Sequence, residues 1–354
     1  MTKVAIVESA GNNLASLQKA LHLIGGIDDL NTSKRDVTVK VGIYHPKSPQ
    51  HTSISLVDAI IKGFDRVRRI FLAESDNYMG TGSDRLKLWS ELFSNRVVPF
   101  NLSEDSETRT VQIGDKSTHM PVELSHILFK PNIFVSTHVL RTFQHGSVLK
   151  NLFGLSPTKK KIQYHKPEIF RSIFADFFEA IGGIDLAVID GQHLYWKCDT
   201  WRVPMNIIIV GRDAVAVETV GATLAGLKPE KIEVLQEFVK RGLGEGNLDR
   251  IEIVGVPFED VREKSKVALK KLRELVASAP KPWSPRDAVD GLIRNGFFKI
   301  PHRRTREEIE TALNNADKRS KGRWKMIYTT MLRRIKKGEL NRTKTPEGWI
   351  YWTE

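Results

Sequence analysis

The chain contains a single cysteine, Cys198, among its 354 residues. One cysteine excludes a disulfide scaffold, a cysteine-based zinc site and an iron–sulfur cluster held by this chain alone. Long hydrophobic runs are missing too, since none approaches the roughly 20 apolar residues that a membrane-spanning helix needs. The first residues, MTKVAIVESAGNN, read as a β-strand and lack the cationic and apolar parts of a signal segment. These absences predict a soluble, cytoplasmic protein without a membrane segment.

Acidic residues are too few to balance the basic ones. Lys and Arg number 55 against 42 Asp and Glu, which gives a net charge of +13 at pH 7. Residues 281–354 contain 18 basic and 9 acidic residues, so most of the excess lies in the last fifth of the chain. The same segment contains apolar and aromatic residues, including Trp324 and Trp349, that a simple solubility tail would lack. We therefore expect a folded basic module that faces a polyanion.

The first 255 residues alternate between short apolar runs and amphipathic helical patterns. The apolar runs lie at residues 4–7, 37–44, 69–74, 133–136, 186–189, 206–210 and 251–254. Helical spacing lies between them, for example at 14–24 and 54–64. Nearly continuous apolar strands separated by helices are typical of a parallel sheet that is buried on both faces. The sequence predicts an α/β fold, a largely parallel sheet with helices on both faces, followed by a small C-terminal domain.

A proline cluster separates two parts of the chain. A charged helical pattern at 260–277 is followed by Pro280, Pro282 and Pro285. Because proline interrupts helices, we place a boundary at 278–283. The predicted domains are residues 1–278 and residues 279–354.

The residues after this boundary predict three helices and a two-stranded hairpin. Ser284 precedes a proline at the start of the first helix, and Thr305 with Glu308 forms a capping-box pattern at the start of the second. The third helix runs from Trp324 to Ile335, and strands follow at 340–343 and 349–352. This order resembles a winged helix-turn-helix domain.

Basic side chains are concentrated on the third helix and the hairpin of this module. They are typical of phosphate contacts, because each neutralised phosphate releases condensed counterions. The candidate nucleic-acid-binding residues are Arg303, Arg304, Arg319, Lys321, Arg323, Lys325, Arg333, Arg334, Lys336, Lys337, Arg342 and Lys344. The partner would be DNA or structured RNA, which these residues do not distinguish. The alternative is that the charges only solvate the helices of a protein-docking module.

The large domain carries a specific set of sequence strings. They are Ser136-Thr-His138, Leu149-Lys-Asn-Leu-Phe-Gly-Leu-Ser-Pro157, Lys159-Lys-Lys161 with His165, Asp190-Gly191 and the segment 210–218. Together they closely resemble the family called domain of unknown function 362, over about residues 3–256. The resemblance implies the fold but no activity, because the family has no agreed one. Many members are associated with iron–sulfur modules, whereas no cofactor is assigned to this chain.

Polar residues at the ends of strands predict a ligand crevice. His138 and Asp190 each end an apolar run, and open α/β sheets bind ligands outside the carboxyl ends of their strands. The candidate small-ligand residues are His138, Lys150, Asn151, His165, Asp190, Asp213 and Glu218. Such groups suit a small phosphate or carboxylate, or a metal with oxygen and imidazole ligands. Asp213 is equally consistent with a helix N-cap, and Asn151 with a bond to a turn.

The chain departs from the family pattern where a ligand would bind. Residues 192–199 are bulky where relatives have a segment rich in Gly and Glu, and Glu218 stands where Asp is common. Residues 40–45 replace a Lys-Pro-Asn type of element. We therefore favour a nucleic-acid-associated protein whose basic module docks the α/β domain on DNA or structured RNA. The alternative is an enzyme, or a small-anion or metal-binding protein, whose C-terminal module serves protein docking or oligomerisation.

Overall fold

The structure is a computed structural model that describes residues 2–9, 11–114, 119–279 and 283–354. The chain forms two compact units, Met1–Ala277 and Ser278–Glu354. The boundary predicted at 278–283 includes residues 280–282, which lie outside the described residues. Among the described residues, no helix is both long and apolar enough to span a membrane.

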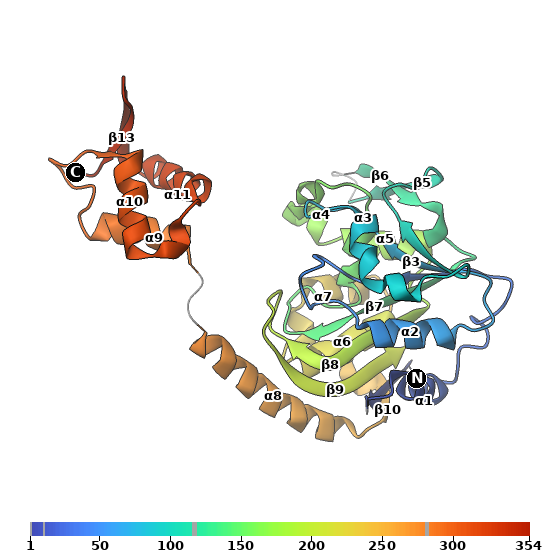
Figure 1. The fold of residues 1–354 in the computed structure, drawn as a ribbon. Coiled ribbons are helices and arrows are strands. Elements are labelled where there is room, and N and C mark those ends of the chain that lie inside the picture. The colour runs from blue at the N-terminus through green and yellow to red at the C-terminus, as the bar shows by residue number, and fades with distance from the viewer. Residues whose placement is uncertain (1, 10, 115–118, 280–282) are drawn as a thin grey trace. The chain divides into compact units, whose positions relative to one another are not determined.

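An eight-stranded sheet forms the centre of the first unit (Figure 1). In spatial order its strands are β10 (Ile251–Gly255), β1 (Thr2–Glu8), β9 (Arg202–Gly211), β8 (Leu186–Tyr195), β7 (Ile133–Arg141), β2 (Val37–Lys40), β3 (Ile70–Glu74) and β4 (Val97–Asn101). β9 pairs antiparallel with β1 and β8, and the other pairings are parallel. The predicted α/β fold with a largely parallel sheet is confirmed.

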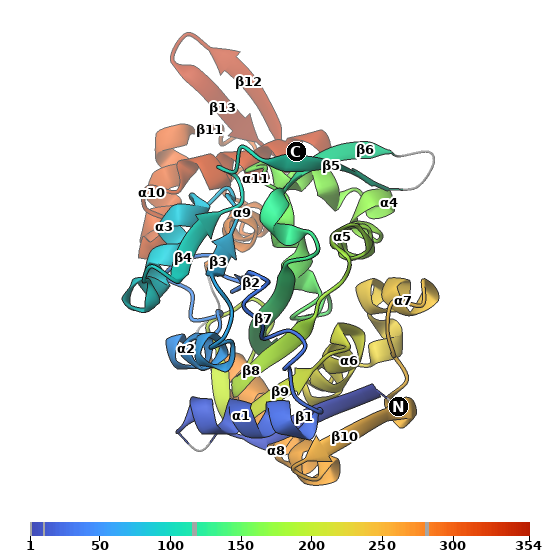
Figure 2. The same cartoon turned by 90° about the vertical axis from the view of Figure 1, so that its right-hand side faces the viewer.

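Helices cover both faces of this sheet. They are α1 (Asn13–Leu23), α2 (Ile54–Gly63), α3 (Gly82–Leu86), α4 (Pro167–Phe170), α5 (Ile173–Ile181), α6 (Ala214–Leu224), α7 (Glu233–Lys240) and α8 (Phe258–Ser278). Figure 2 shows α5, α6 and α7 on one side of the strands and α2 on the other. Short 3₁₀ helices are η1 (Lys87–Leu92), η2 (His126–Leu128), η3 (Lys150–Leu155), η4 (Lys161–His165), η5 (Pro229–Lys231), η6 (Leu248–Arg250) and η7 (Lys318–Ser320).

Two hydrophobic cores lie on the two faces, because successive side chains of a strand point to opposite sides. Val135 and Val188 belong to the core that includes residues of α1 and α2. Phe134 and Ile189, their neighbours in sequence, belong to the core that includes residues of α5, α6 and α7. The carboxyl ends of the strands are therefore held at one edge by packing on both faces.

The sequence analysis did not predict three strands of this unit. These are β4 and the two strands of a separate antiparallel ribbon, β5 (Thr108–Ile113) and β6 (Met120–Ser125). β4 contains Pro99, and the exposed positions of β5 are polar, so neither has the apolar run of a buried strand.

The second unit contains three helices and a small sheet. Its elements are α9 (Pro285–Arg294), β11 (Arg304–Thr305), α10 (Arg306–Ala316), α11 (Trp324–Lys336), β12 (Asn341–Thr345) and β13 (Gly348–Trp352), with the strand order β11-β13-β12. Ser284 caps α9, and Thr305 and Glu308 form the capping box of α10, as predicted. Its core is separate from those of the first unit and includes Val289, Ile327 and Tyr351. The predicted helices are confirmed, whereas β11 was not predicted.

Candidate functional site

Polar side chains lie at the carboxyl ends of two neighbouring strands of the first unit, β2 and β3, and within the longer strands β7 and β8 beside them. Lys40 ends β2, Glu74 ends β3, His138 lies near the end of β7 and Asp190 lies in β8. These strands are parallel neighbours, so all four residues lie at one edge of the sheet. Each is more than nine-tenths buried. This is the edge at which open α/β sheets bind ligands.

A buried ion cluster joins the ends of β2 and β3. Lys40 Nζ lies 2.6 Å from Glu74 Oε1, and Arg85 Nη1 lies 3.4 Å from Glu74 Oε2. The backbone N–H of Ile43 donates to Glu74 Oε1 as well, at 2.9 Å. Burial alone would raise the pKa of Glu74, but Lys40 and Arg85 hold that pKa below its ordinary value. Burial lowers the pKa of Lys40, and the Glu74 carboxylate opposes that shift.

The sequence analysis did not count these residues among the site candidates. Lys40 and Glu74 end adjacent strands in the same way as His138, which is a signal that could have found them. Lys161, from the string Lys159-Lys-Lys161, also lies here, and its ammonium donates to Ser75 Oγ at 3.0 Å. Burial and, to a smaller extent, the charge of the nearby Lys40 together lower the pKa of Lys161 to about 7.

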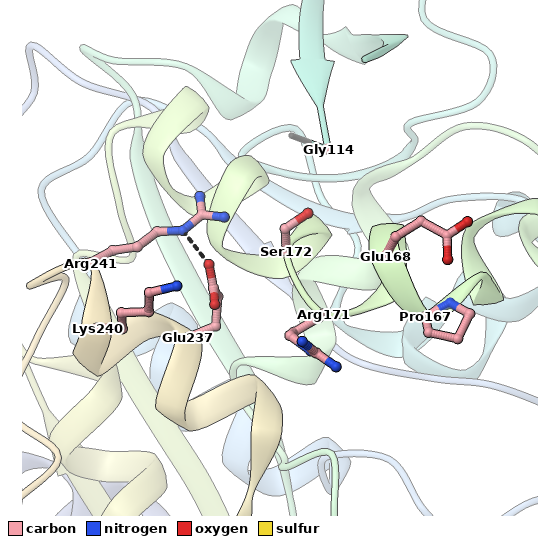
Figure 3. A pocket seen from close by; sticks show the side chains of 8 residues that line it. All are labelled: Gly114, Pro167, Glu168, Arg171, Ser172, Glu237, Lys240 and Arg241. Atoms are coloured by element: carbon pink, nitrogen blue, oxygen red, sulfur yellow. Dashed lines mark hydrogen bonds and ion pairs between the residues drawn. The ribbon is translucent and has the colours of Figure 1, made fainter. Parts of the chain in front are cut away.

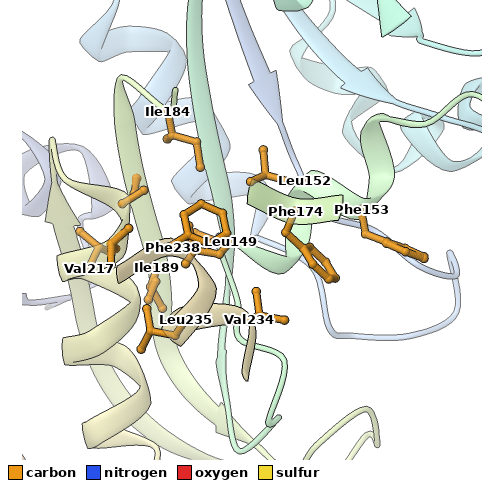
Figure 4. Packing of buried hydrophobic residues seen from close by; sticks show 14 of the residues in the cluster. Leu149, Leu152, Phe153, Phe174, Ile184, Ile189, Val217, Val234, Leu235 and Phe238 are labelled. Carbon is orange, nitrogen blue, oxygen red and sulfur yellow. The ribbon is translucent and has the colours of Figure 1, made fainter. Parts of the chain in front are cut away.

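Asn151 ties the 3₁₀ helix η3 to the strand ends. Its amide nitrogen donates to the Lys40 carbonyl at 2.8 Å and to the Thr137 carbonyl at 3.1 Å. Leu149, Leu152 and Phe153 from the same segment belong to the hydrophobic core (Figure 4). The apolar residues of the Leu-Lys-Asn-Leu-Phe-Gly-Leu run therefore anchor it, while Asn151 bonds the ends of β2 and β7. These acceptors belong to strands, whereas the alternative interpretation of Asn151 was a bond to a turn.

His138 has a defined tautomer in this arrangement. Its Nδ1 accepts the backbone N–H of Val139 at 2.7 Å, so Nε2 carries the proton of the neutral ring. Burial lowers the pKa of His138 well below its ordinary value, and the charges of Arg141 and Lys150 lower it further. Nε2 has no hydrogen-bond partner in the described part of the chain. The ring therefore presents one free N–H donor.

Gly42 brings His138 and Asn151 together. It has φ +65°, and a Cβ at this position would lie 2.6 Å from His138 Cδ2 and 3.0 Å from Asn151 Oδ1. Both side chains therefore lie directly against the Gly42 backbone. Only glycine allows this close approach with a left-handed conformation.

Lys150 is half-buried and contacts aromatic rings. Its Nζ lies 5.5 Å from the ring centre of Phe143 and 5.6 Å from that of Phe153. It makes no hydrogen bond or ion pair with any described residue. Arg141 lies over the Phe143 ring at 5.0 Å and donates from Nε and Nη2 to the Gly146 carbonyl. Burial and, to a smaller extent, the charge of Arg141 together lower the pKa of Lys150 to about 8.

Asp190 does not join His138 in one crevice. Strand pairing places His138 opposite Ile189 and Val139 opposite Asp190. Since paired residues share a face and successive residues alternate, His138 and Asp190 point to opposite faces of the sheet. Asp190 instead accepts the backbone N–H groups of Ser53, at 2.8 Å, and Gln192, at 3.1 Å, and so holds the start of α2.

Three further candidates, Glu218, Asp213 and His165, make contacts within the fold and do not join His138 and Lys150. Glu218 is buried and accepts the N–H groups of Ser147 and Leu149, at 2.8 and 3.0 Å. Asp213 is the N-cap of α6, and its other oxygen accepts the N–H of Glu245. His165 is exposed and stacks on a phenylalanine ring. Glu218 positions the loop before Lys150, because its carboxylate bonds the backbone of that loop.

A hollow of 490 Å³ lies elsewhere in the first unit, and Figure 3 shows its lining. Arg241 contributes its main cation but donates to Glu237 at 2.8 Å and to Asp176 and Glu179 at 2.7 Å. Because three carboxylates already neutralise its guanidinium, Arg241 is not free to bind a ligand in this hollow.

In the second unit, α11 carries a one-sided basic surface. Lys325, Thr329, Arg333 and Lys336 are exposed and recur at helical spacing, so they lie on one face. The sequence of α11 contains no acidic residue. We call these four residues the α11 face.

The other basic candidates of the second unit differ in their contacts. Arg304, Arg319 and Arg334 form ion pairs with Glu308, Asp317 and Asp290, respectively, and Arg334 also pairs with Glu339. Arg303, Arg323 and Arg342 lie over the rings of Trp352, Trp283 and Trp349. The candidates without an ion pair to another described residue include Lys321, Lys325, Arg333, Lys336, Lys337 and Lys344.

The comparisons with known proteins bear on the first unit. No curated protein matches the chain. A similar solved structure is the lactate racemase apoprotein from Thermoanaerobacterium thermosaccharolyticum, at 14% identity and a TM-score of 0.36. That alignment covers 60% of this chain and 54% of the other, so the chain spans about half of that protein. Residues 37–223 match the family described as Domain of unknown function (DUF362). The matched segment is more than half of the chain and includes Lys40, His138 and Lys150, and the chain therefore belongs to the DUF362 family.

Proposed function

We propose that the second unit is a winged helix that binds double-stranded DNA through the α11 face and docks the DUF362 unit on it. The observation that carries this proposal is a helix with exposed Lys325, Arg333 and Lys336 on one face and no acidic residue. Each phosphate that such cations neutralise releases condensed counterions, which favours binding. The order of α9, α10, α11 and the β12–β13 hairpin is the order of a winged helix.

The groove geometry of nucleic acids favours DNA over double-stranded RNA as the partner. The major groove of B-DNA is about 12 Å wide and admits an α-helix. The major groove of A-form RNA is deep and narrow, so side chains cannot read it. On the hairpin, Lys344 is exposed and Trp349 is 39% exposed, and both are suited to contact the adjacent backbone.

Sequence preference is expected to be modest. α11 contains no Asn or Gln, the side chains that pair in bidentate fashion with adenine. Its cations suit phosphate contacts, which position a protein but carry no sequence information. The DUF362 unit would thus be placed on DNA without strict selection of a site.

The test compares the full-length protein with two triple variants of equal net charge. Lys325→Gln/Arg333→Gln/Lys336→Gln removes the cations of the α11 face. Arg294→Gln/Lys299→Gln/Lys318→Gln removes three exposed cations outside α11. Fluorescence anisotropy would follow binding to short DNA duplexes of unrelated sequence and to an RNA hairpin, at several salt concentrations.

We expect the α11 variant to bind every duplex more weakly, and its plot of log affinity against log salt to flatten by about 2 to 3 units. The control variant should stay close to the wild type. An equal loss in both variants would show that net charge alone matters and would contradict the assignment to α11. Absence of wild-type DNA binding at low salt would overturn the proposal and favour a protein-docking unit.

A further inference from the structure

We propose that the first unit binds a small oxyanion, a phosphate or a carboxylate, between Lys150, His138 and Arg141 at the end of β7. This proposal does not rest on DNA binding by the second unit. It joins three features of one place in the fold: an unpaired ammonium, a free imidazole N–H and a partly used guanidinium.

The Lys150 ammonium is the first of these features. Withdrawing a cation from water is costly unless the cation is paired. Lys150 is half-buried, yet its described contacts are the rings of Phe143 and Phe153. A ring face attracts a cation but supplies no hydrogen-bond acceptor of carboxylate strength. An oxyanion would supply that acceptor.

The His138 ring is the second feature. It is 7% exposed, its Nδ1 is occupied by the Val139 N–H, and its Nε2 proton has no acceptor in the described chain. The ring lies against Gly42 together with Asn151, the residue after Lys150. The free N–H therefore lies beside the start of η3, where Lys150 is placed.

Arg141 completes the donor set. It shares the Phe143 ring with Lys150, and its Nε and Nη2 bond the Gly146 carbonyl, which leaves Nη1 to donate elsewhere. Glu218 is the carboxylate that acts on Arg141, but its oxygens already accept the N–H groups of Ser147 and Leu149. Positive charge therefore predominates around the Phe143 ring.

These groups define the class of ligand by what they share. An ammonium, a guanidinium and an imidazole N–H all donate hydrogen bonds, and an oxyanion offers several acceptor oxygens to match them. A metal ion suits this place poorly, because two cations would repel it. No group of three or more His, Cys, Asp or Glu side chains is placed to hold a metal anywhere in the described residues.

The experiment uses the full-length protein carrying the α11 triple substitution, so that the basic second unit does not obscure binding by the first. Isothermal titration calorimetry at pH 7 would measure inorganic phosphate in one arm and succinate in the other. Lys150→Gln is the test variant. Lys160→Gln is the matched control, because Lys160 is an exposed lysine of the nearby loop without an ion pair.

We expect Lys150→Gln to weaken binding about 10- to 100-fold, the range for loss of one charged hydrogen bond, and Lys160→Gln to leave it unchanged. The melting temperature of Lys150→Gln should not fall, because the variant removes an unpaired cation. Binding in either arm supports the proposal and identifies the oxyanion. Failure of both ligands to bind, or equal affinity in Lys150→Gln, would overturn it. Neither result depends on whether the second unit binds DNA.

Discussion

Glu74→Gln should destabilise the first unit strongly, because Glu74 neutralises two buried cations. Its carboxylate lies 2.6 Å from Lys40 Nζ and 3.4 Å from Arg85 Nη1, and the three side chains are only 1% to 3% exposed. Glutamine keeps the size of the side chain but removes its charge. Its amide would also place a donor beside Lys40, Arg85 or the Ile43 N–H.

The size of the effect follows from this burial. Breaking a buried ion pair by removing one partner costs about 3 to 5 kcal/mol, because an uncompensated charge stays buried. In a unit of this size each kcal/mol lowers the melting temperature by about 2 to 3 °C, so we expect a decrease of about 6 to 15 °C. Glu263→Gln is the matched control. Its pair with Lys266 is 66% and 56% exposed, and it should change stability by no more than about 1 kcal/mol.

Thermal unfolding followed by circular dichroism would measure these changes. The double variant Lys40→Met/Glu74→Leu should recover part of the loss, since well-packed apolar residues often replace a buried pair at little cost. Equal melting temperatures for Glu74→Gln and Glu263→Gln would refute the reasoning, and would show that Glu74 is neutral in the folded protein.

The buried ion pair of Glu74 with Lys40 also predicts that the stability of the first unit depends on pH in the acidic range. The folded pKa of Glu74 is lower than its ordinary value of 4.5. Its ionisation therefore stabilises the fold above pH 4.5, and this contribution is lost as the pH falls through the lowered pKa. Glu74→Gln should lack this part of the acid-induced loss of stability, as melting temperatures measured between neutral and acidic pH would show.

The remaining predictions concern Gly42, Lys150 and the domain boundary. Gly42→Ala should lower the melting temperature more than Gly25→Ala: both glycines have a positive φ, but only Gly42 lies against His138, and nothing lies within 4 Å of a Cβ at Gly25. Equal decreases in the two variants would contradict the close contact between Gly42 and His138. Phosphate affinity in calorimetry should fall as the pH rises through about 8, because the pKa of Lys150 is lowered to that value and its neutral amine attracts no anion. The neighbouring Arg141, with a pKa of about 10, stays charged in this range, so a flat profile of affinity against pH would exclude Lys150 as the cation that binds phosphate. Limited proteolysis should cut near 278–284 and leave a core of about residues 1–278 detectable by mass spectrometry, and a single resistant fragment of full length would argue against two domains.

The sequence by itself determined the features that depend on neighbours along the chain. The apolar runs of β2, β7 and β8 predicted a parallel sheet because strands buried on both faces need apolar residues at every position. Ser284 and Thr305 predicted the starts of α9 and α10, since an N-cap side chain bonds the backbone two or three residues later. The family strings were equally local and predicted membership of the DUF362 family.

Only the tertiary structure decided which polar groups meet. Strand order and register bring Lys40 beside Glu74, 34 residues away, and send His138 and Asp190 to opposite faces of the sheet. Arg334 looked like a phosphate-binding residue, but the packing of α9 places Asp290 beside it. Partners so distant in sequence leave no periodic signal, because their contact depends on the packing of whole elements. Lys150 shows the converse, since its ammonium lies beside two aromatic rings and pairs with no carboxylate among the residues that the structure describes.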